Sequence, residues 1–323
     1  MKIETIREAA GRLAGHARRT PLLSSPFLDE IAGRRVLVKP ECLQHTGSFK
    51  YRGARNTLAA MAPERRARGV IAFSSGNHAQ GVALSAREFG VPAVIIMPSD
   101  APALKIANTR ALGAEVVLYD RASEDRDEIG ARLAGARGLT LVRPFDEPLV
   151  IAGQGTVGLE IAEDAAALGL DAAAVLVPCG GGGLTSGIAT ALAAEAPGLR
   201  VHPVEPEGFD DVKRSLIAGE IQRNTRLSGS ICDAIITPAP GDLTWPIIRR
   251  LCGAGIAVSE DEALMAMAAA FTRLKIVIEP GGAVALAAAL YHGSEIEGEA
   301  VIAVASGGNV DAALFRMALE RFG

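Results

Sequence analysis

Lys50 lies in a segment whose residue types and spacing suit carbonyl chemistry. The segment Thr46-Gly47-Ser48-Phe49-Lys50 follows a predicted strand and opens a predicted helix, which Thr46 or Ser48 could cap. Lys50 would then lie in the first helical turn, where the helix dipole disfavours a cation by ~0.3–1 kcal/mol. Burial lowers the pKa of a lysine further, and a neutral amine is what Schiff-base formation requires. Taken alone, such a segment is more commonly an ordinary surface lysine at a helix start.

Two further loops offer groups that bind anions. Ser74-Ser75-Gly76-Asn77-His78 joins a predicted strand to a predicted helix, and its hydroxyls, amide and backbone N–H groups could hold a carboxylate. An N-cap with a turn glycine is the alternative. Gly180-Gly181-Gly182-Gly183 also joins a strand to a helix, at a cost in backbone entropy. Four glycines are useful where backbone N–H groups must close on an anion such as a phosphate. The well-patterned flanking elements disfavour a flexible linker.

One glycine motif points elsewhere. Gly153-Gln154-Gly155-Thr156-Val157-Gly158 has the spacing of dinucleotide-binding loops. Such a site requires an acidic residue at the end of the next strand, where it holds a ribose. The next predicted strand, 173–177, ends instead in Pro178 and Cys179. We therefore expect no nicotinamide nucleotide at this motif.

Polar residues also follow two later predicted strands. Ser306-Gly307-Gly308-Asn309 follows the strand 300–305, and its hydroxyl could meet a heteroaromatic nitrogen; a helix N-cap is the alternative. Glu205, Asp210 and Asp211 follow the strand 200–204 and could hold a hard cation through oxygen ligands. A solvated acidic loop is the commoner explanation of such a cluster.

The elements that must position these loops alternate between strands and helices. This rhythm predicts βαβ units, hence parallel sheets covered by helices, and it occurs once before residue 146 and again after residue 150. Ligands in such folds bind at the carboxyl ends of the strands, here in a cleft between two α/β units. The predicted strands are 35–39, 70–73, 93–97, 115–119, 139–142, 173–177, 200–204, 255–258 and 300–305; the predicted helices include 78–89, 156–168, 184–195, 260–274 and 282–290.

The composition excludes several classes of function. The 323 residues are 49% hydrophobic, enough for two domains. A net charge of −4 and 4% aromatic residues argue against a nucleic-acid binder. No apolar stretch approaches the ~20 residues of a membrane helix, and the charged N-terminus has no signal core. The four cysteines form no CxxC pair, which suits a reducing cytoplasm.

Taken together and in chain order, these loops resemble the fold-type II (tryptophan synthase β-like) pyridoxal-phosphate enzymes. The closest resemblance is to the threonine/serine dehydratases and serine racemases. It implies two parallel-sheet α/β domains with the active site in the cleft. Residues 1–68 plus 147–323 would form the large, cofactor-binding domain, and 69–146 the small, substrate-binding domain. The motifs that carry the resemblance are Ser48-Phe49-Lys50, Ser75-Gly76-Asn77-His78, Gly153-Gln154-Gly155-Thr156, the four glycines and Ser306-Gly307-Gly308-Asn309.

The resemblance also implies roles for single residues. Lys50 would carry pyridoxal 5'-phosphate covalently, and Phe49 would pack on its ring. Asn77 would meet the ring hydroxyl, and Ser306 would face the ring nitrogen. The backbone N–H groups that would bind the phosphate belong to Gly180, Gly181, Gly182, Gly183 and Leu184. The residues that would face the substrate are Ser74, Ser75, Gly76, His78, Arg126 and Phe145.

A metal site and a quaternary structure follow from the same resemblance. Glu205, the backbone carbonyl of Phe209 and Asp211 match the spacing of the ligands in metal-dependent racemases and dehydratases, which implies Mg²⁺ or Ca²⁺. A homodimer is expected. The chain ends soon after Ser306, so we expect neither the regulatory domain of long threonine dehydratases nor control by isoleucine.

The activity that the resemblance favours is dehydration and deamination of L-threonine or L-serine to a 2-oxo acid and ammonia, with Lys50 removing the Cα proton. Two positions disagree about racemisation. Ser75 could act on the opposite face of Cα, as in serine racemases, whereas Phe145 resembles the dehydratases and favours a substrate with a methyl group. A racemase or bifunctional enzyme and a 3-hydroxyaspartate ammonia-lyase stay open as alternatives. A non-enzymatic amino-acid-binding protein would not require Lys50 beside four glycines.

Overall fold

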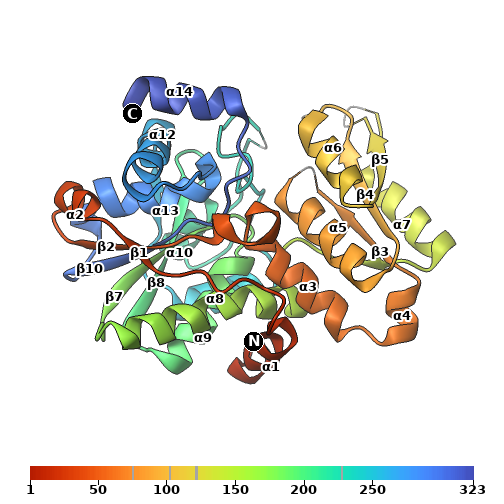
Figure 1. The fold of residues 1–323 in the computed structure, drawn as a ribbon, viewed down its shortest axis with the longest axis horizontal. Coiled ribbons are helices and arrows are strands. Elements are labelled where there is room, and N and C mark those ends of the chain that lie inside the picture. The colour runs from red at the N-terminus through yellow and green to blue at the C-terminus, as the bar shows by residue number, and fades with distance from the viewer. Residues whose placement is uncertain (75, 102, 121–122, 227) are drawn as a thin grey trace.

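Two sheets, each covered by helices on both faces, make up the fold (Figure 1). The computed structural model describes residues 1–74, 76–101, 103–120, 123–226 and 228–323. One sheet has six strands in the order β1-β2-β10-β7-β8-β9, and the other has four in the order β5-β4-β3-β6. Within the described ranges every strand pairing is parallel except that of β1 with β2. The predicted α/β class with parallel sheets is confirmed.

The six-stranded sheet is buried on both faces, as its runs of valine, isoleucine and alanine require. Leu37, Val175 and Ile302 pack with α8 and α9 on one face, while Val36 and Leu176 pack with α12 and α13 on the other. The strands are β1 (Leu23–Ser24), β2 (Arg35–Lys39), β7 (Ala173–Pro178), β8 (Leu199–Pro206), β9 (Ile256–Val258) and β10 (Ala300–Val304); the covering helices are α8 (Pro148–Ala167), α9 (Gly183–Glu195), α12 (Glu260–Ala269) and α13 (Pro280–Tyr291).

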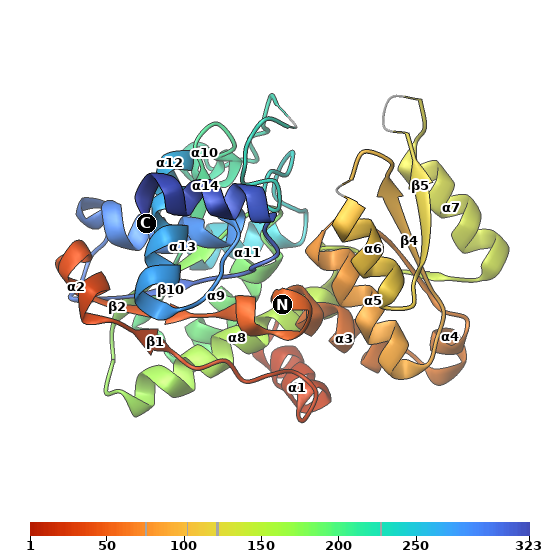
Figure 2. The same cartoon turned by 45° about the horizontal axis from the view of Figure 1, so that its top comes forward.

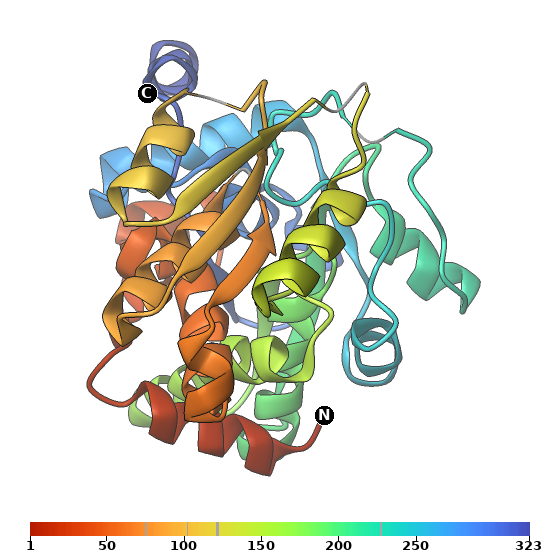
Figure 3. The ribbon, with the colours of Figure 1, turned by 90° about the vertical axis from the view of Figure 1, so that its right-hand side faces the viewer.

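The four-stranded sheet carries the loop that ends in Asn77. Figure 3 shows this unit nearest the viewer, with α7 crossing one side of its sheet. Ile129 of α7 packs on one face of the sheet, and Leu58 of α3 and Val82 of α5 pack on the other. The elements are β3 (Val70–Phe73), β4 (Ala93–Pro98), β5 (Glu115–Tyr119), β6 (Thr140–Leu141), α3 (Lys50–Ala60), α5 (Asn77–Phe89), α6 (Ala103–Ala111) and α7 (Arg126–Arg137).

The remaining helices lie around the two sheets. Figure 1 and Figure 2 show α14 (Ala312–Phe322) beside α12, where Leu314 and Phe315 pack on the core. In the part of the chain that the structure describes, no helix is both long and apolar enough to cross a membrane. The further elements are α1 (Ile3–Leu13), α2 (Pro26–Ala32), η1 (Glu41–Leu43), η2 (His45–Gly47), α4 (Pro63–Ala67), α10 (Asp211–Ala218), α11 (Thr244–Leu251), the π-helical turn η3 (Ala270–Leu274) and η4 (Gly293–Glu295).

Two predicted helices have different limits in the structure. The helix predicted from residue 156 begins at Pro148, because Glu147 caps it by accepting a hydrogen bond from the Val150 N–H (2.9 Å). The 153–158 motif therefore lies inside α8, where its glycines permit close packing: a Cβ on Gly153 would lie 2.7 Å from the Arg52 carbonyl oxygen. The helix predicted over 260–274 is α-helical only to Ala269 and ends in a π turn.

The predicted cap of the helix that begins at Lys50 is wrong. Phe49 occupies the N-cap position, and no side chain caps the helix. Ser48 is extended (φ −164°, ψ 158°) because it pairs with Gly307 in an isolated antiparallel bridge. The hydroxyls of Thr46 and Ser48 have no hydrogen-bond partner among the described residues. The chain thus enters α3 from a strand-like pairing with the Ser306 loop.

Candidate active site

A cleft of about 620 Å³ lies between the two sheets, at the carboxyl ends of β3, β7 and β10. It brings together every predicted cofactor and substrate residue that the structure describes. Ser75 lies outside the described residues. The predicted residues that line the cleft are Phe49, Lys50, Ser74, Gly76, Asn77, His78, Arg126, Phe145, Gly180, Gly181, Gly182, Gly183, Leu184 and Ser306.

Lys50 is the first residue of α3, and its amine reaches into the cleft. The Nζ atom donates a hydrogen bond to the Pro144 carbonyl (2.8 Å) and lies 5.2 Å from the centroid of the Phe49 ring. Burial lowers the pKa of Lys50 to about 8, although the nearby Glu279 raises it. This is the direction that the sequence predicts for a buried lysine, and it makes the amine a better nucleophile near neutral pH.

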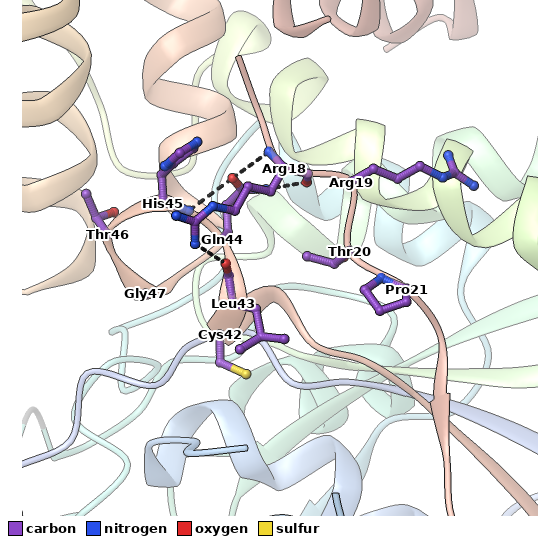
Figure 4. A pocket seen from close by; sticks show the side chains of 10 residues that line it. All are labelled: Arg18, Arg19, Thr20, Pro21, Cys42, Leu43, Gln44, His45, Thr46 and Gly47. Carbon is purple, nitrogen blue, oxygen red and sulfur yellow. Dashed lines mark hydrogen bonds between the residues drawn. The ribbon is translucent and has the colours of Figure 1, made fainter. Parts of the chain in front are cut away.

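The segment that leads to Lys50 lines a second pocket, shown in Figure 4. Gln44 Oε1 accepts hydrogen bonds from the backbone N–H groups of Arg18 (2.9 Å) and His45 (3.0 Å), and its Nε2 donates to the Arg18 carbonyl (2.8 Å). The Arg18 guanidinium donates to the Leu43 carbonyl (2.9 Å), and Arg19 points away from it in the figure. These polar groups therefore fix the loop that leads to Lys50.

The glycine loop forms a cradle of backbone N–H groups at the start of α9. A Cβ on Gly181 would lie 2.3 Å from the Phe145 ring, and one on Gly180 would lie 2.9 Å from the Ile235 carbonyl oxygen. Gly182 has φ 88°, which favours glycine. The N–H groups of Gly181 to Leu184 donate to no acceptor recorded among the described residues. Free amides at a helix N-terminus fit a phosphate.

Ser306 follows β10 and is buried at 5% exposure. Its carbonyl accepts a hydrogen bond from the Phe49 N–H (3.1 Å), so the loop holds the residue that precedes Lys50. The Ser306 hydroxyl makes no hydrogen bond recorded with a described residue and faces the same cleft. A free hydroxyl can serve a heteroaromatic nitrogen as donor or acceptor.

Glu279 is a cleft residue that the sequence analysis missed. Its carboxylate Oε1 accepts a hydrogen bond from Asn77 Nδ2 (2.5 Å), and Asn77 Oδ1 accepts one from Asn309 Nδ2 (2.7 Å). Burial raises the pKa of Glu279 to about 7. The one signal in the sequence is an acidic residue directly before Pro280 and two glycines, between a helix and the strand that precedes the Ser306 loop.

His78 is a neutral structural residue at the edge of the cleft. It is 2% exposed, and its Nε2 lies 2.9 Å from the Val142 carbonyl. Burial and the charge of Lys50 lower its pKa to about 3. Because a carbonyl only accepts, Nε2 carries the proton, and Nδ1 has no partner among the described residues.

The predicted metal ligands Glu205 and Asp211 lie close enough to act on each other's charge, and they do not line the cleft. Glu205 and Asp211 are fully buried, and Glu205 accepts hydrogen bonds from the N–H groups of Val212 (3.0 Å) and Lys213 (2.7 Å). Asp211 Oδ2 has no partner among the described residues. Burial first, and then repulsion by neighbouring carboxylates, raises the pKa of Glu205; burial raises that of Asp211 to about 6. Such an uncompensated oxygen fits a cation.

A cation there would rely on backbone and water oxygens as well. Phe209 lies between Glu205 and Asp211 in the sequence, and its side chain is buried. No group of three or more histidine, cysteine, aspartate or glutamate side chains with the geometry of a metal site occurs among the described residues. Asp210, the third acidic residue of this loop, is paired with Arg214 at 3.3 Å.

Comparisons with known proteins agree with this geometry. The L-threo-3-hydroxyaspartate ammonia-lyase of Saccharomyces cerevisiae is 42% identical over 95% of this chain and 92% of its own length. The L-threonine ammonia-lyase of Thermotoga maritima is also 42% identical, over 96% of this chain and 76% of its own. The serine racemase of Oryza sativa subsp. indica is 39% identical, over 96% and 91%.

The chain is also similar to solved structures and to a family profile. The T.th. threonine deaminase superposes with a TM-score of 0.90 at 45% identity, over 96% of this chain and 99% of that one. Maize serine racemase superposes with a TM-score of 0.91 at 37% identity, over 99% and 97%. Residues 13–307 match the family described as pyridoxal-phosphate dependent enzymes. The chain belongs to this family of pyridoxal-phosphate dependent enzymes, of the fold-type II class.

Proposed function

We propose that the protein is an ammonia-lyase that converts L-threonine and L-serine to a 2-oxo acid and ammonia. One observation carries the proposal: the Lys50 amine, with its lowered pKa, faces the same cleft as the free N–H groups of the glycine loop. An amine and a phosphate cradle in one cleft suit pyridoxal phosphate. Relatives named for ammonia-lyase activity support the reaction class.

The cleft residues have different roles in the proposed reaction. Pyridoxal phosphate supplies, when bound, an aldehyde that condenses with amines and a ring that withdraws electrons from Cα. Lys50 holds the cofactor and, once the substrate amine replaces it, takes the Cα proton. The N–H groups from Gly180 to Leu184 hold the phosphate. Ser306 offers the ring nitrogen a neutral partner. Gly76 and the free N–H groups that open α5 bind the substrate carboxylate.

The overall reaction balances without an oxidant or reductant. L-Threonine loses its Cα proton and its β-hydroxyl as one water molecule. The enamine that is released tautomerises and then takes up one water molecule. The products are 2-oxobutanoate and ammonia, and L-serine gives pyruvate and ammonia in the same way.

The test is spectroscopic as well as catalytic. The purified protein with pyridoxal phosphate should show a visible absorption band that borohydride abolishes, and it should form 2-oxo acids from L-threonine and L-serine. Lys50→Ala should lose both the borohydride-sensitive band and turnover, because the Lys50 amine is the group that both steps require. A Lys50→Ala protein that retains turnover contradicts the proposal.

A second candidate substrate is L-threo-3-hydroxyaspartate. Arg143 lines the cleft, is exposed, and has no side-chain partner recorded among the described residues. It directly precedes Pro144, whose carbonyl the Lys50 amine contacts. A free guanidinium could bind the second carboxylate of this substrate. Oxaloacetate formation from the four 3-hydroxyaspartate isomers tests the candidate, with L-threonine assayed beside them.

Racemisation is the third candidate, and it depends on Ser75. Loss and return of the Cα proton on opposite faces requires a second acid/base, for which Ser75 is the proposed group. We expect D-serine to form from L-serine in the wild type and not in Ser75→Ala. If the wild type forms no D-serine, the protein is a lyase alone.

We also propose that Glu205, Asp211 and the Phe209 carbonyl bind Mg²⁺ or Ca²⁺. The buried, unpartnered Asp211 oxygen supports this proposal within the described part of the chain. A chelator should then lower the thermal midpoint of the wild type, because the two carboxylates would repel each other without a cation. Glu205→Gln should remove the response to chelator. An unchanged thermal midpoint in chelator would show that the site binds no ion.

The quaternary structure and the location are further proposals. Phe27 and Phe271 are exposed on α2 and η3, and Arg273 stacks on the Phe27 ring at 4.7 Å. Exposed aromatic rings of this kind support burial against a second copy. Analytical ultracentrifugation should show a dimer.

We also propose that residues 69–146 form the small domain. The protein is further proposed to be cytoplasmic, since its four cysteines are free and buried.

A further inference from the structure

We propose that Glu279 is a positioning residue of the cofactor site. Its carboxylate holds the side-chain amide of Asn77 in the orientation that keeps one N–H available to an acceptor in the cleft. The inference rests on the proposed function, because the acceptor it assigns is the ring oxygen of pyridoxal phosphate.

Three hydrogen bonds link Glu279 to the backbone carbonyl of Thr46. Asn77 Nδ2 donates to Glu279 Oε1 (2.5 Å). Asn77 Oδ1 accepts from Asn309 Nδ2 (2.7 Å), and Asn309 Nδ2 also donates to the Thr46 carbonyl (2.8 Å). The chain of bonds therefore joins α5 of the small unit to the loop after β10 and to the segment before Lys50.

The direction of these bonds has one consistent solution. The Thr46 carbonyl can only accept, so Asn309 must turn its Nδ2 toward it, and both hydrogens of that nitrogen are then committed. An ionised carboxylate also only accepts, so Asn77 must turn its Nδ2 toward Glu279. If the Asn77 amide were reversed, two oxygens would face each other at Glu279 and two N–H donors would face each other at Asn309.

One N–H of Asn77 remains after these commitments. An amide nitrogen carries two hydrogens, and Glu279 accepts one of them. No described residue is recorded as accepting the other, and Asn77 lines the cleft. The network thus leaves a single directed donor on the cleft side, which suits an anionic or hydroxyl oxygen of a bound ring.

The position of Glu279 is itself fixed. It is 4% exposed and directly precedes α13, where the positive end of the helix dipole favours a carboxylate. Its N–H donates to the Gly307 carbonyl (3.0 Å). A Cβ on Gly307 would lie 2.2 Å from Glu279 Oε1, so the glycine after Ser306 provides the space for the carboxylate.

The neighbours of Glu279 act on its charge in opposite directions. Burial raises its pKa to about 7; the bond from Asn77 opposes this, Asp233 reinforces it, and Lys105 and Lys50 oppose it. The bond from Asn77 stabilises the ionised form, which cannot donate. A protonated carboxyl could instead donate to Asn77 Oδ1 and permit the reversed amide.

Glu279→Gln tests the inference, because glutamine keeps the size of the side chain and can both donate and accept. We expect this variant to bind pyridoxal phosphate about tenfold more weakly, the loss of about one good hydrogen bond. We also expect a changed balance between the visible and near-ultraviolet bands of the bound cofactor, which reports protonation around the ring oxygen. Glu220→Gln is the matched control: it makes the same substitution at an exposed position that does not line the cleft, so both readouts should stay within about twofold.

A second variant covers the case in which Glu279→Gln does not fold. Asn309→Asp, at a half-buried position, removes the donor to Asn77 Oδ1 and should shift the bands in the same direction. If either folded variant has the affinity and spectrum of the wild type, or if Glu220→Gln shifts them equally, the inference is overturned. A wild type that binds no pyridoxal phosphate would instead overturn the proposed function.

Discussion

We propose that the Phe145 side chain distinguishes L-threonine from L-serine. Its ring lines the cleft and packs against Gly181. An apolar ring favours the extra methyl group of threonine, and one such group in a hydrophobic pocket is worth ~1–3 kcal/mol. We expect Phe145→Asn to lower the ratio of kcat/KM for L-threonine to that for L-serine by roughly tenfold.

The ratio serves as its own control, because any loss of folded or loaded enzyme affects both substrates equally. Initial rates of 2-oxo acid formation over a range of each substrate provide the measurement. A fall that is the same for both substrates would mean that Phe145 supports the glycine loop without contacting the substrate methyl group.

The residues that could be located from the sequence are those whose local pattern is itself costly or unusual. Four glycines between a strand and a helix are one such pattern, and a lysine at a helix start after Gly47-Ser48-Phe49 is another. Glu279 has no such pattern. Its role depends on a hydrogen bond to a residue 202 positions away, and only the folded chain brings the two together.

At the scale of elements, a buried ionic cluster anchors α3 two residues beyond Lys50. Arg52 is 1% exposed and donates to Glu41 at 2.7 and 2.8 Å and to Glu160 at 2.6 and 3.0 Å. Arg52→Met would leave the fully buried Glu41 without its counter-charge. We expect a loss of ~3–5 kcal/mol in the free energy of unfolding, measured by urea denaturation.

Arg7 provides the matched control for this cluster. It pairs with Glu195 at 2.7 Å on the surface, with its own side chain 58% exposed. Arg7→Met should therefore cost less than ~1 kcal/mol. Equal losses in the two variants would show that the buried cluster adds no more than a surface ion pair does.

His292 links α13 to α12 and makes stability depend on pH. Its ring lies 2.8 Å from Glu295 and 3.1 Å from Glu262. Burial opposes the charged form, but these two contacts outweigh it and raise the pKa of His292 above its usual 6.5. The stabilisation is therefore complete below pH 6.5 and disappears as the pH rises through the folded-state pKa.

His292→Gln should accordingly destabilise the protein more at about pH 6 than at about pH 9. The difference should amount to a few tenths of a kcal/mol up to ~1 kcal/mol, because the pair is partly solvated. Thermal denaturation of wild type and variant at both pH values measures it. A difference that is larger at about pH 9 than at about pH 6 would contradict a raised pKa of His292.

The limits of the elements were predictable where burial alternates with polar turns. The strands 35–39, 70–73 and 115–119 have the predicted bounds. The start of α8 and the entry to α3 were not predictable. Gly153 serves a close approach to α3, and Ser48 pairs with Gly307. Both depend on a partner far away in the sequence, and neither local pattern reveals it.

At the scale of the whole molecule, contacts across the cleft join the two sheets. The alternation of strands and helices predicts two α/β units, and parallel strands place their carboxyl ends at one edge. Which loops meet across that edge is set by tertiary packing. Lys50 contacts Pro144, Asn77 contacts Glu279, and Lys105 of α6 lies 3.4 Å from Asp233 of the large unit.

The pair between Lys105 and Asp233 is the contact whose strength should depend on salt. The Lys105 side chain is 15% exposed and that of Asp233 is 62% exposed, so we expect about 0.2–1 kcal/mol from the pair. Lys105→Met should raise KM for L-threonine by roughly two- to fivefold, because the substrate must then hold the units together without it. The effect should shrink as added salt screens the pair.

A double-mutant cycle separates this contact from a general effect of charge. If the two side chains act together, Asp233→Asn added to Lys105→Met should raise KM no further. Lys275→Met is the control, since the Lys275 amine bonds to the Thr272 carbonyl and does not line the cleft; its KM and its salt dependence should equal those of the wild type. Independent, additive effects of the two cleft substitutions would mean that the ion pair does not couple the two units, and that the contacts of Lys50 with Pro144 and of Asn77 with Glu279 join them without its help.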